Sequence, residues 1–431
     1  MNNQVLHTGT LAHLRGDPFV HADALEIIPD GALAVDAEGR IAAAGERAEL
    51  LRKFPEAAVI DHGRDWLIPG LVDAHLHFPQ FYATAAAGGQ LLDWLERSVF
   101  PAEAAFLDED FATRTAERFV AKLLACGTTT AMVFGSEYYP ANAALFEAAR
   151  QSGLHLIAGM TLMDRNAPPA LLQTIEQAVD GMARLMALRA GEPRLHYAVT
   201  PRWPMACSET LLRICGELLR EHPECYLQTH INENRGEIAA VAAGFPDSRH
   251  YLDVYDRYGL VGPRTLLAHG IHSTDAELAR MAAAGCAVCH CPTSNLYLGS
   301  GLFPLRRHLE HGIAVAMGTD IGAGTEFSVW RELAEAYKVQ QLLGFRLDAA
   351  RLLYLGTLGG ARALRLDHET GNFEPGKSAD FFALGYVDDD YLASRLDRCG
   401  SAEEQLFCLL HLAGEARVRA TYVQGRLVMK P

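Results

Sequence analysis

Eight short apolar segments, separated by stretches with helical periodicity, run from Trp66 to Asp320 of this 431-residue chain. The segments lie near Leu67–His75, Thr128–Phe134, Leu154–Met160, Leu195–Val199, Cys225–His230, Thr265–His269, Cys286–Cys291 and Ile313–Thr319. The intervening stretches repeat apolar residues every three to four positions, most clearly over Ala104–Cys126, Ala170–Leu188 and Ser208–Leu219. Strands that alternate with helices of this length predict an α/β fold with a parallel sheet, and a count of eight predicts closure into a (β/α)8 TIM-like barrel.

The first apolar segment leads into His75-Leu76-His77. Residues i and i+2 of a β-strand point to the same face, so both imidazoles are expected to enter one space at the end of the strand. Two neutral imidazoles that converge on a point suit a divalent metal such as zinc. A polar strand end without a metal is equally compatible with this pattern taken alone.

Three later apolar segments also end on a residue that can bind a metal or move a proton. These residues are His230, His269 and Asp320. In a (β/α)8 barrel, the catalytic residues come from the C-terminal ends of several strands and meet on one rim. The ordered set therefore predicts a metal site on that rim.

Short alternating segments also occur on both sides of the predicted barrel. Gly31–Asp36 and Arg40–Ala44 precede it, and Ala379–Leu384 and Val418–Val423 follow it. Neither terminal part has enough strands for a sheet of its own, so we expect the two parts to pair with each other. The predicted domains are a small flanking β-sandwich of residues 1–66 and 368–431 and a metal-binding (β/α)8 barrel of residues 67–367.

The charge balance disfavours nucleic acid as a partner. The chain has 38 basic and 53 acidic residues and a formal net charge of −15, whereas phosphate binding needs a basic surface. The same balance disfavours an anionic membrane surface, and no uninterrupted apolar run reaches the roughly 18 residues that a membrane span needs. A small-molecule substrate is compatible with this composition.

Cysteine usage and the first residues predict a cytoplasmic protein. The segment from Met1 to His7 has neither a basic nor an apolar signal region, and nine cysteines, an odd number, are typical of reduced thiols. The cluster Cys286–Cys291 resembles half of a zinc knuckle, but the chain has no second Cys-x-x-Cys pair to complete it. We therefore expect these cysteines to be core residues.

The chain resembles the amidohydrolase superfamily, in its mononuclear deaminase branch, through an ordered set of five residues: His75, His77, His230, His269 and Asp320. The segment Gly371–Asp380 resembles the superfamily's return to its flanking sheet. Binuclear members usually carry a bridging carboxylated lysine on the fourth strand. Leu195–Thr200 contains no lysine, which favours a single metal.

Within the superfamily, the chain resembles the guanine deaminases. The stretches that carry this resemblance are His75–Gln80, Leu92–Leu95, Phe100–Glu103, Thr200–Trp203, Gln228–Asn234, Cys291–Asn295 and Gly318–Asp320. Trp203 stands where the family often has Phe, and Asn232 stands where it usually has Ser. The resemblance implies hydrolytic deamination of guanine to xanthine and ammonia, by a protein that forms a homodimer.

The resemblance also implies roles at the metal. The implied ligands of one zinc ion per chain, with iron(II) as an alternative, are His75, His77, His230 and Asp320. A catalytic zinc lowers the pKa of its water to about 7. Asp320 is then also the acceptor of a proton from the attacking water, and His269 orients that water. Glu233 carries a proton to the ring and then to the leaving amine, as general acid–base catalysis requires.

Four residues are expected to bind the purine. Gln80 both donates and accepts hydrogen bonds towards the ring edge, and Arg202 donates to a carbonyl such as O6. Trp203 offers a face for stacking, and Glu233 contacts the ring nitrogen that it protonates. A buried Arg-Trp pair with a purely structural role is the alternative interpretation of residues 202 and 203.

Three other functions remain open from the sequence. A related ring, such as 8-oxoguanine, a pterin or a triazine, would need a similar site. Cyclic-amide hydrolysis would use a similar metal, although the absent lysine weakens its hydantoinase version. A non-catalytic scaffold predicts lost metal ligands, whereas all five positions are intact.

Overall fold

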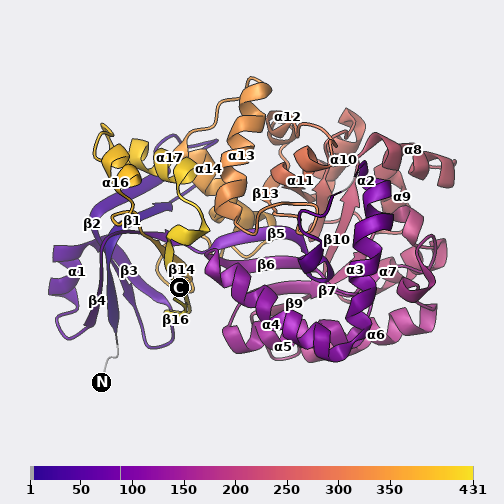
Figure 1. Ribbon diagram of the computed structural model, residues 1–431, viewed down its shortest axis with the longest axis horizontal. Helices are drawn as coiled ribbons and strands as arrows, with labels where there is room; N and C mark the ends of the chain where they lie inside the picture. The colour runs from indigo at the N-terminus through magenta and orange to yellow at the C-terminus, as the bar shows by residue number, and fades with distance from the viewer. Residues whose placement is uncertain (1–3, 88, 431) are drawn as a thin grey trace. The chain divides into compact units, whose positions relative to one another are not determined.

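The computed structural model describes residues 4–87 and 89–430 of the chain. The chain forms two compact units (Figure 1). One unit combines both terminal parts, residues 1–72 and 328–431, with the short segment 121–130. The other unit comprises residues 73–120 and 131–327. The first three residues and the last one lie outside the described part.

A sheet of parallel strands forms the barrel, and its strands follow one another around the sheet in chain order. They are β5 (Leu71–His77), β6 (Thr128–Phe134), β7 (His155–Gly159), β9 (Leu195–Pro201), β10 (Tyr226–Ile231), β11 (Thr265–His269), β12 (Ala287–His290) and β13 (Ala314–Met317), with the short β8 (Thr161–Leu162) paired to β9. After β13, the backbone N–H of Asp320 donates to the carbonyl of His75 at 2.8 Å, which brings the last strand back to the first. The predicted barrel is confirmed.

Amphipathic helices connect the barrel strands. They are α2 (Leu91–Trp94), α3 (Phe100–Ala104), α4 (Glu109–Ala125), α5 (Tyr139–Ser152), α6 (Ile175–Leu188), α7 (Glu209–Glu221), α8 (Arg235–Gly244), α9 (Tyr251–Arg257), α10 (Asp275–Ala284), α11 (Pro292–Tyr297) and α12 (Leu305–Glu310). Helix α7 shows why they form: the Ser208 side chain accepts from the Leu211 N–H and caps the first turn, and Leu211, Leu212 and Cys215 form the buried face. Short 3-10 or π turns lie at Phe78–Ala83, Leu95–Val99, Ala105–Leu107, Pro169–Leu171 and Pro204–Ala206.

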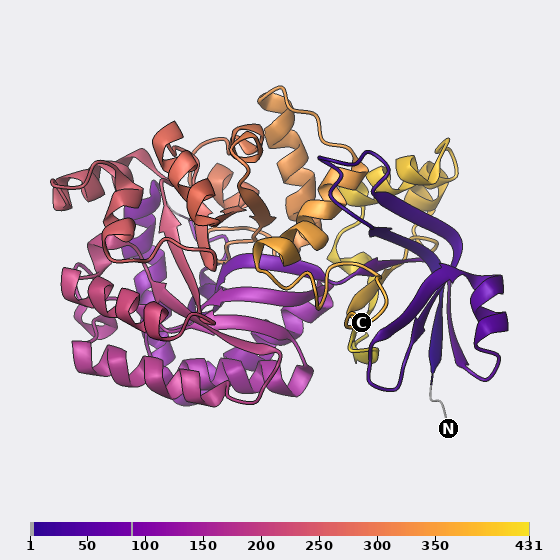
Figure 2. The same ribbon diagram turned by 180° about the vertical axis from the view of Figure 1, so that it is seen from behind.

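A mixed sheet contains strands from both ends of the chain, as Figure 2 shows from behind in indigo and yellow. Its order is β16-β15-β14-β4-β1-β2-β3. The strands are β1 (Val5–Leu14), β2 (Leu25–Val35), β3 (Ile41–Glu46), β4 (Ala58–Pro69), β14 (Phe381–Leu384), β15 (Val418–Val423) and β16 (Arg426–Met429). The predicted pairing of the two terminal parts is confirmed, because β14 pairs antiparallel with β4.

The core of this terminal sheet follows the period-two alternation of its strands. Leu33 and Val35 of β2 belong to one apolar cluster, which also contains Phe381, whereas Ala32 and Ala34 belong to a second cluster. The helices of this unit, apart from the end of α4, are α1 (Arg47–Lys53), α13 (Val329–Leu342), α14 (Ala349–Gly356), α15 (Leu358–Ala363), α16 (Asp390–Leu396) and α17 (Ala402–Leu412), with a 3-10 turn at Glu415–Arg417.

The predicted first strand, Leu67–His75, is divided between two sheets. Residues up to Pro69 end β4 of the terminal sheet, and Leu71 begins β5 of the barrel. Gly70 lies between them, and a side chain there would come within 1.9 Å of the Thr129 hydroxyl. An apolar run shows no break at such a point, because both sheets bury the same kind of residue.

No helix within residues 4–87 and 89–430 is both long enough and apolar enough to cross a membrane.

Candidate active site

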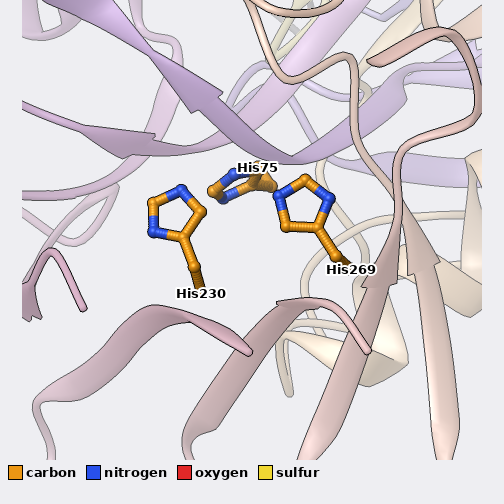
Figure 3. A group of neighbouring side chains, drawn as sticks. All are labelled: His75, His230 and His269. Carbon is orange, nitrogen blue, oxygen red and sulfur yellow. The ribbon is translucent and has the colours of Figure 1, made fainter. Parts of the chain in front are cut away.

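Five ionisable side chains meet at the C-terminal ends of the barrel strands. His75 and His77 end β5, His230 lies near the end of β10, His269 ends β11 and Asp320 follows β13. The ligand atoms of His75, His230 and His269 all lie within 4.8 Å of one another, and so do those of His75, His77 and Asp320. Figure 3 shows the first three imidazoles turned toward a common centre. The predicted convergence is therefore present in the structure.

The ring nitrogens and the carboxylate oxygens of this cluster lie close enough to one another to share one cation. Asp320 Oδ1 is 3.2 Å from His75 Nε2 and 3.3 Å from His77 Nε2. His77 Nε2 is also 3.2 Å from His230 Nε2. A divalent cation satisfies such a group of lone pairs, since zinc sites combine imidazole nitrogens with carboxylate oxygens.

His75 gives the clearest test of fit for a cation. Its side chain is fully buried, and within the described residues neither ring nitrogen makes a hydrogen bond. A buried polar atom without a partner costs roughly 1–3 kcal/mol. The donor set around His75 therefore fits a metal ion, which would take the lone pair of Nε2, the nitrogen that faces Asp320.

Burial keeps these groups in the protonation states that a cation needs. It lowers the pKa of His77 to about 3 and, together with the neighbouring histidines, lowers the pKa of His230 well below its ordinary value. Burial alone would raise the pKa of Asp320, but the adjacent imidazoles, first of all His75, hold it well below its ordinary value. Neutral imidazoles and an ionised carboxylate are the forms that ligate metals.

Outer hydrogen bonds orient these side chains. The Nδ1 of His230 lies 2.7 Å from the carbonyl oxygen of Arg202. Because a carbonyl only accepts, His230 carries its proton on Nδ1 and turns the Nε2 lone pair into the cluster. The hydroxyl of Ser294 donates to Asp320 Oδ2 at 2.6 Å, and His269 Nδ1 lies 3.0 Å from Asn295 Oδ1.

The backbone is strained at the same rim. His269 and Asp320 adopt left-handed φ values of 71° and 49°, and so does Asn232, at 50°. Such conformations cost of order 1–3 kcal/mol for residues other than glycine, and they persist where the surroundings over-determine them. They aim the side chains of two cluster members.

Glu233 faces this cluster from the loop after β10. It is buried, its Oε2 lies 3.5 Å from His269 Nε2, and the Ser300 hydroxyl donates to its Oε1 at 3.2 Å. Burial, reinforced by the charge of Asp320, raises the pKa of Glu233 to about 8. At neutral pH the carboxyl group therefore holds a proton that it can give away.

A second buried network surrounds Arg202, just beyond β9. Its Nη1 donates to both oxygens of Glu103, at 2.9 and 2.7 Å, and lies 3.7 Å from Glu137. Gln80 donates to the same Glu103 at 2.9 Å and accepts from the Gly322 N–H at 3.1 Å. Glu103 thus holds an amide and a guanidinium in fixed positions.

The cluster and the network line one pocket, which has room of about 40 Å³ for the centres of water-sized groups. Its polar lining includes His77, Gln80, Arg202, His230, Glu233, His269 and Asp320. Trp203, which is partly exposed, lines it together with the apolar residues Leu91, Trp94 and Leu298. The structure thus brings together every predicted site residue, with His75 fully buried at its base.

Comparison with known proteins gives the family. Residues 66–428 match the model of the amidohydrolase family. The chain belongs to the amidohydrolase family.

Individual relatives of this amidohydrolase cover its whole length. It is 43% identical over 430 residues to a protein of Deinococcus radiodurans described as a probable guanine deaminase. The alignment covers 98% of this chain and 98% of the relative. It is 41% identical to the guanine deaminase of Escherichia coli strain K12, over 96% of this chain and 94% of the relative. A solved structure of guanine deaminase from C. acetobutylicum with bound guanine matches with a TM-score of 0.90 at 28% identity, covering 99% and 100% of the two chains.

The amidohydrolase family is metal-dependent, and the cluster of histidines with Asp320 is the candidate metal site of this chain.

Several residues of the site were not predicted from the sequence of this amidohydrolase. Glu103, Ser294 and Asn295 stood there only within similar stretches, and Glu137 and Ser300 received no role. Glu103 contacts Arg202 from 99 positions away, and no local pattern reports such a contact. Ser294 and Asn295 follow β12 directly, so the rule that strand ends carry the site could have found them.

Proposed function

We propose that the protein hydrolyses guanine to xanthine and ammonia. The full-length relatives at 41–43% identity support the reaction, and the solved relative with bound guanine supports the substrate. The observation that carries the proposal is the shared pocket. It places a cluster that fits a metal, a carboxyl group that holds a proton and a pair of hydrogen-bonding side chains around one space.

The proposed cofactor is one zinc ion per chain. Its ligands would be His75, His77, His230 and Asp320, and iron(II) suits the same donors. The orphaned nitrogens of His75 support a cation at this place. The barrel strand β9, Leu195–Pro201, contains no lysine that could bridge a second metal.

When bound, the cation would supply a water of lowered pKa and a positive charge that polarises the substrate. Asp320, which is ionised, accepts a proton from the attacking water, and His269 hydrogen-bonds to that water. The water oxygen adds to C2 of guanine, and Glu233 delivers its proton to the neighbouring ring nitrogen.

Collapse of the tetrahedral centre completes the reaction. The hydroxyl group on C2 gives its proton to the ionised Glu233, which passes it to the amine. The C2–N bond then breaks, ammonia leaves and C2 keeps the oxygen as the carbonyl of xanthine. The ring nitrogen keeps the first proton, and the proton on Asp320 returns to Glu233. One water is consumed and one ammonia is released, so atoms and charge balance.

The base is recognised from its other edge. The guanidinium of Arg202 is a donor only, so it complements the 6-oxo group of guanine. Gln80 contacts the ring edge beside it, and Trp203 stacks on the purine. Glu103 supports this arrangement because it accepts hydrogen bonds from both Arg202 and Gln80.

A substrate panel tests the proposal against related rings. Ammonia release is measured from guanine, 8-oxoguanine, isoxanthopterin and a triazine, and ring opening is measured with hydantoin. Guanine is expected to have the highest kcat/KM, with no turnover of hydantoin. A higher kcat/KM for another ring would show that this ring, and not guanine, is the preferred substrate. Turnover of hydantoin alone would show that the protein opens cyclic amides and does not deaminate guanine.

The predicted homodimer, cytoplasmic location and lack of nucleic-acid partners stay predictions of the sequence. Sedimentation of the purified protein at micromolar concentration tests the dimer.

A further inference from the structure

Two cysteines far along the chain from the site lie side by side in the terminal unit. Cys399 follows helix α16, and Cys408 lies within helix α17. Their sulfur atoms are 3.7 Å apart. To form a disulfide, the sulfurs would have to approach from this separation to about 2.05 Å.

The two thiols have different surroundings. Cys399 is partly exposed, and Arg395 Nη1 donates to its sulfur at 3.1 Å. A guanidinium beside a sulfur stabilises the thiolate, the form that reacts with oxidants. Glu404 shares this guanidinium at 3.3 Å, and the thiol of Cys399 donates to the carbonyl oxygen of Arg395 at 3.6 Å.

Cys408 is more sheltered than Cys399. Only 7% of it is exposed, so solvent oxidants reach Cys399 first. Burial raises the pKa of Cys408 to about 11, which keeps it as a thiol until a sulfur partner becomes electrophilic. One accessible sulfur beside a cation and one sheltered sulfur within reach are the parts of a dithiol that forms a disulfide.

We propose that Cys399 and Cys408 form a reversible peroxide-oxidised disulfide. The Cys399 thiolate attacks hydrogen peroxide, the O–O bond breaks, hydroxide leaves and Cys399 becomes a sulfenic acid. The sulfur of Cys408 then attacks that of Cys399. The S–O bond breaks, the Cys408 proton leaves with the oxygen as water, and the two sulfurs are joined. Peroxide is reduced by two electrons and the dithiol is oxidised by two.

The disulfide would join the middle of helix α17 to the segment that follows α16. The Trp330 indole N–H donates to the carbonyl of Leu409, the neighbour of Cys408, at 3.0 Å and so ties α17 to α13. The bridge closes the short segment 399–408, which restricts the unfolded chain. Oxidation is therefore expected to raise the temperature at which this unit unfolds.

A second cysteine pair provides an internal comparison. Cys289 and Cys291 have sulfurs 3.9 Å apart, but both residues are fully buried. Proximity alone would oxidise both pairs, whereas the proposal requires access and a neighbouring guanidinium. Oxidation is therefore expected at Cys399 and Cys408 and not at residues 289 and 291.

Peptide mapping of the full-length protein tests the proposal directly. Trypsin cuts after Arg398 and Arg417, so both cysteines fall in one peptide. After treatment with hydrogen peroxide and alkylation with iodoacetamide, this peptide is expected to carry no alkyl group and to have two hydrogens fewer than the free dithiol. Reduction with dithiothreitol before alkylation should restore both. A peptide that stays doubly alkylated, or a cross-link that forms first at residues 289 and 291, would overturn the proposal.

Variants separate the two steps. In Cys408→Ser, the sulfenic acid of Cys399 is expected to persist and to react with dimedone, whereas Cys399→Ser should give neither adduct nor disulfide. Arg395→Met is expected to slow disulfide formation severalfold. Cys126→Ser, which removes a buried thiol that contacts Glu415, is the matched control and should oxidise like the wild type. Equal oxidation rates in the wild type and Arg395→Met would remove the guanidinium from the account.

Discussion

The rim of the barrel and the terminal sheet use their buried residues in opposite ways. On the rim, His75, Glu233 and Asp320 are buried ionisable groups. Asp320, His269 and Asn232 hold left-handed backbone conformations there. In the terminal sheet, Phe381 stacks on Tyr422 at 4.5 Å between ring centroids, within a largely apolar cluster.

The difference separates the residues that stabilise the fold from those that perform chemistry. Burying apolar area contributes about 25 cal/mol per Å², whereas burying a polar group without a partner costs free energy. The buried ionisable residues of the rim therefore lower the stability of the fold, whereas the buried apolar residues of the terminal sheet raise it. Variants of the two regions should change different measurements.

The largest effect is expected for His230→Ala. The change removes one proposed ligand, so both bound metal and ammonia release should fall to background. Metal content per chain and kcat are measured together, with His311→Ala, a histidine outside the pocket, as the control. Full metal content in His230→Ala would show that His230 is not a ligand, and two equivalents in the wild type would contradict a mononuclear site.

Phe381→Ala should have the largest effect on stability. Truncating a fully buried phenylalanine costs about 3–5 kcal/mol, which denaturant unfolding measures directly. The kcat of the molecules that remain folded should stay near that of the wild type. Val59→Ala, at a half-exposed position of β4, is the control and should change the free energy of unfolding by less than about 0.5 kcal/mol. A large drop in kcat for Phe381→Ala would erase the distinction between the two regions.

Glu233→Gln sharpens the comparison from the side of the site. The amide keeps the shape but cannot give up the proton, so kcat should fall by on the order of 10²-fold or more. Folding raises the pKa of this carboxyl group to about 8, so at neutral pH the unfolded chain gains free energy by ionising it. The amide removes that penalty, so the free energy of unfolding should rise while the metal content stays the same. The exposed Glu221→Gln serves as the control. A kcat near that of the wild type would remove Glu233 from the mechanism.

The smallest effect is expected for the residues behind the purine. Glu103→Gln weakens hydrogen bonds to Arg202 and Gln80, which should lower kcat/KM for guanine by about tenfold, the value of one charged hydrogen bond. 2-Aminopurine has no 6-oxo group, so its kcat/KM should fall less. Equal losses of kcat/KM for both purines would show that Glu103 stabilises the fold and does not help to recognise the 6-oxo group.

Glu137→Gln is the matched change in the same network. Within the described residues, neither carboxylate oxygen of Glu137 makes a hydrogen bond, and burial together with the charge of Glu103 raises the pKa of Glu137 well above its ordinary value. The neutral amide should therefore change kcat/KM by less than Glu103→Gln does.

Much of the fold was predictable from the sequence because strands and helices have different periods. The eight apolar segments and the two terminal parts follow from that difference, and the rule of strand ends then brought His75, His230, His269 and Asp320 to one rim. The boundary at Gly70 escaped prediction because residues on either side of it are buried by different sheets.

The supporting part of the site was less predictable. Contacts such as Glu103 with Arg202 join an α-helix to a strand end across 99 positions, and their formation depends on how the barrel closes. The left-handed backbone of His269 and Asp320 also has no signal in the sequence, since neither residue is glycine. These features come from tertiary structure, which forces local strain at the site.

One measurement tests the central claim most directly: kcat/KM of the purified, metal-assayed protein for guanine and for adenine. Adenine carries a 6-amino group, whose hydrogens would face the donors of Arg202, and a buried polar group left unpaired costs about 1–3 kcal/mol. Adenine would also have to rotate in the pocket to bring C6 to the reacting water. The account predicts efficient release of ammonia from guanine, with xanthine as the product, and scarcely any from adenine. Comparable kcat/KM for the two purines would contradict it.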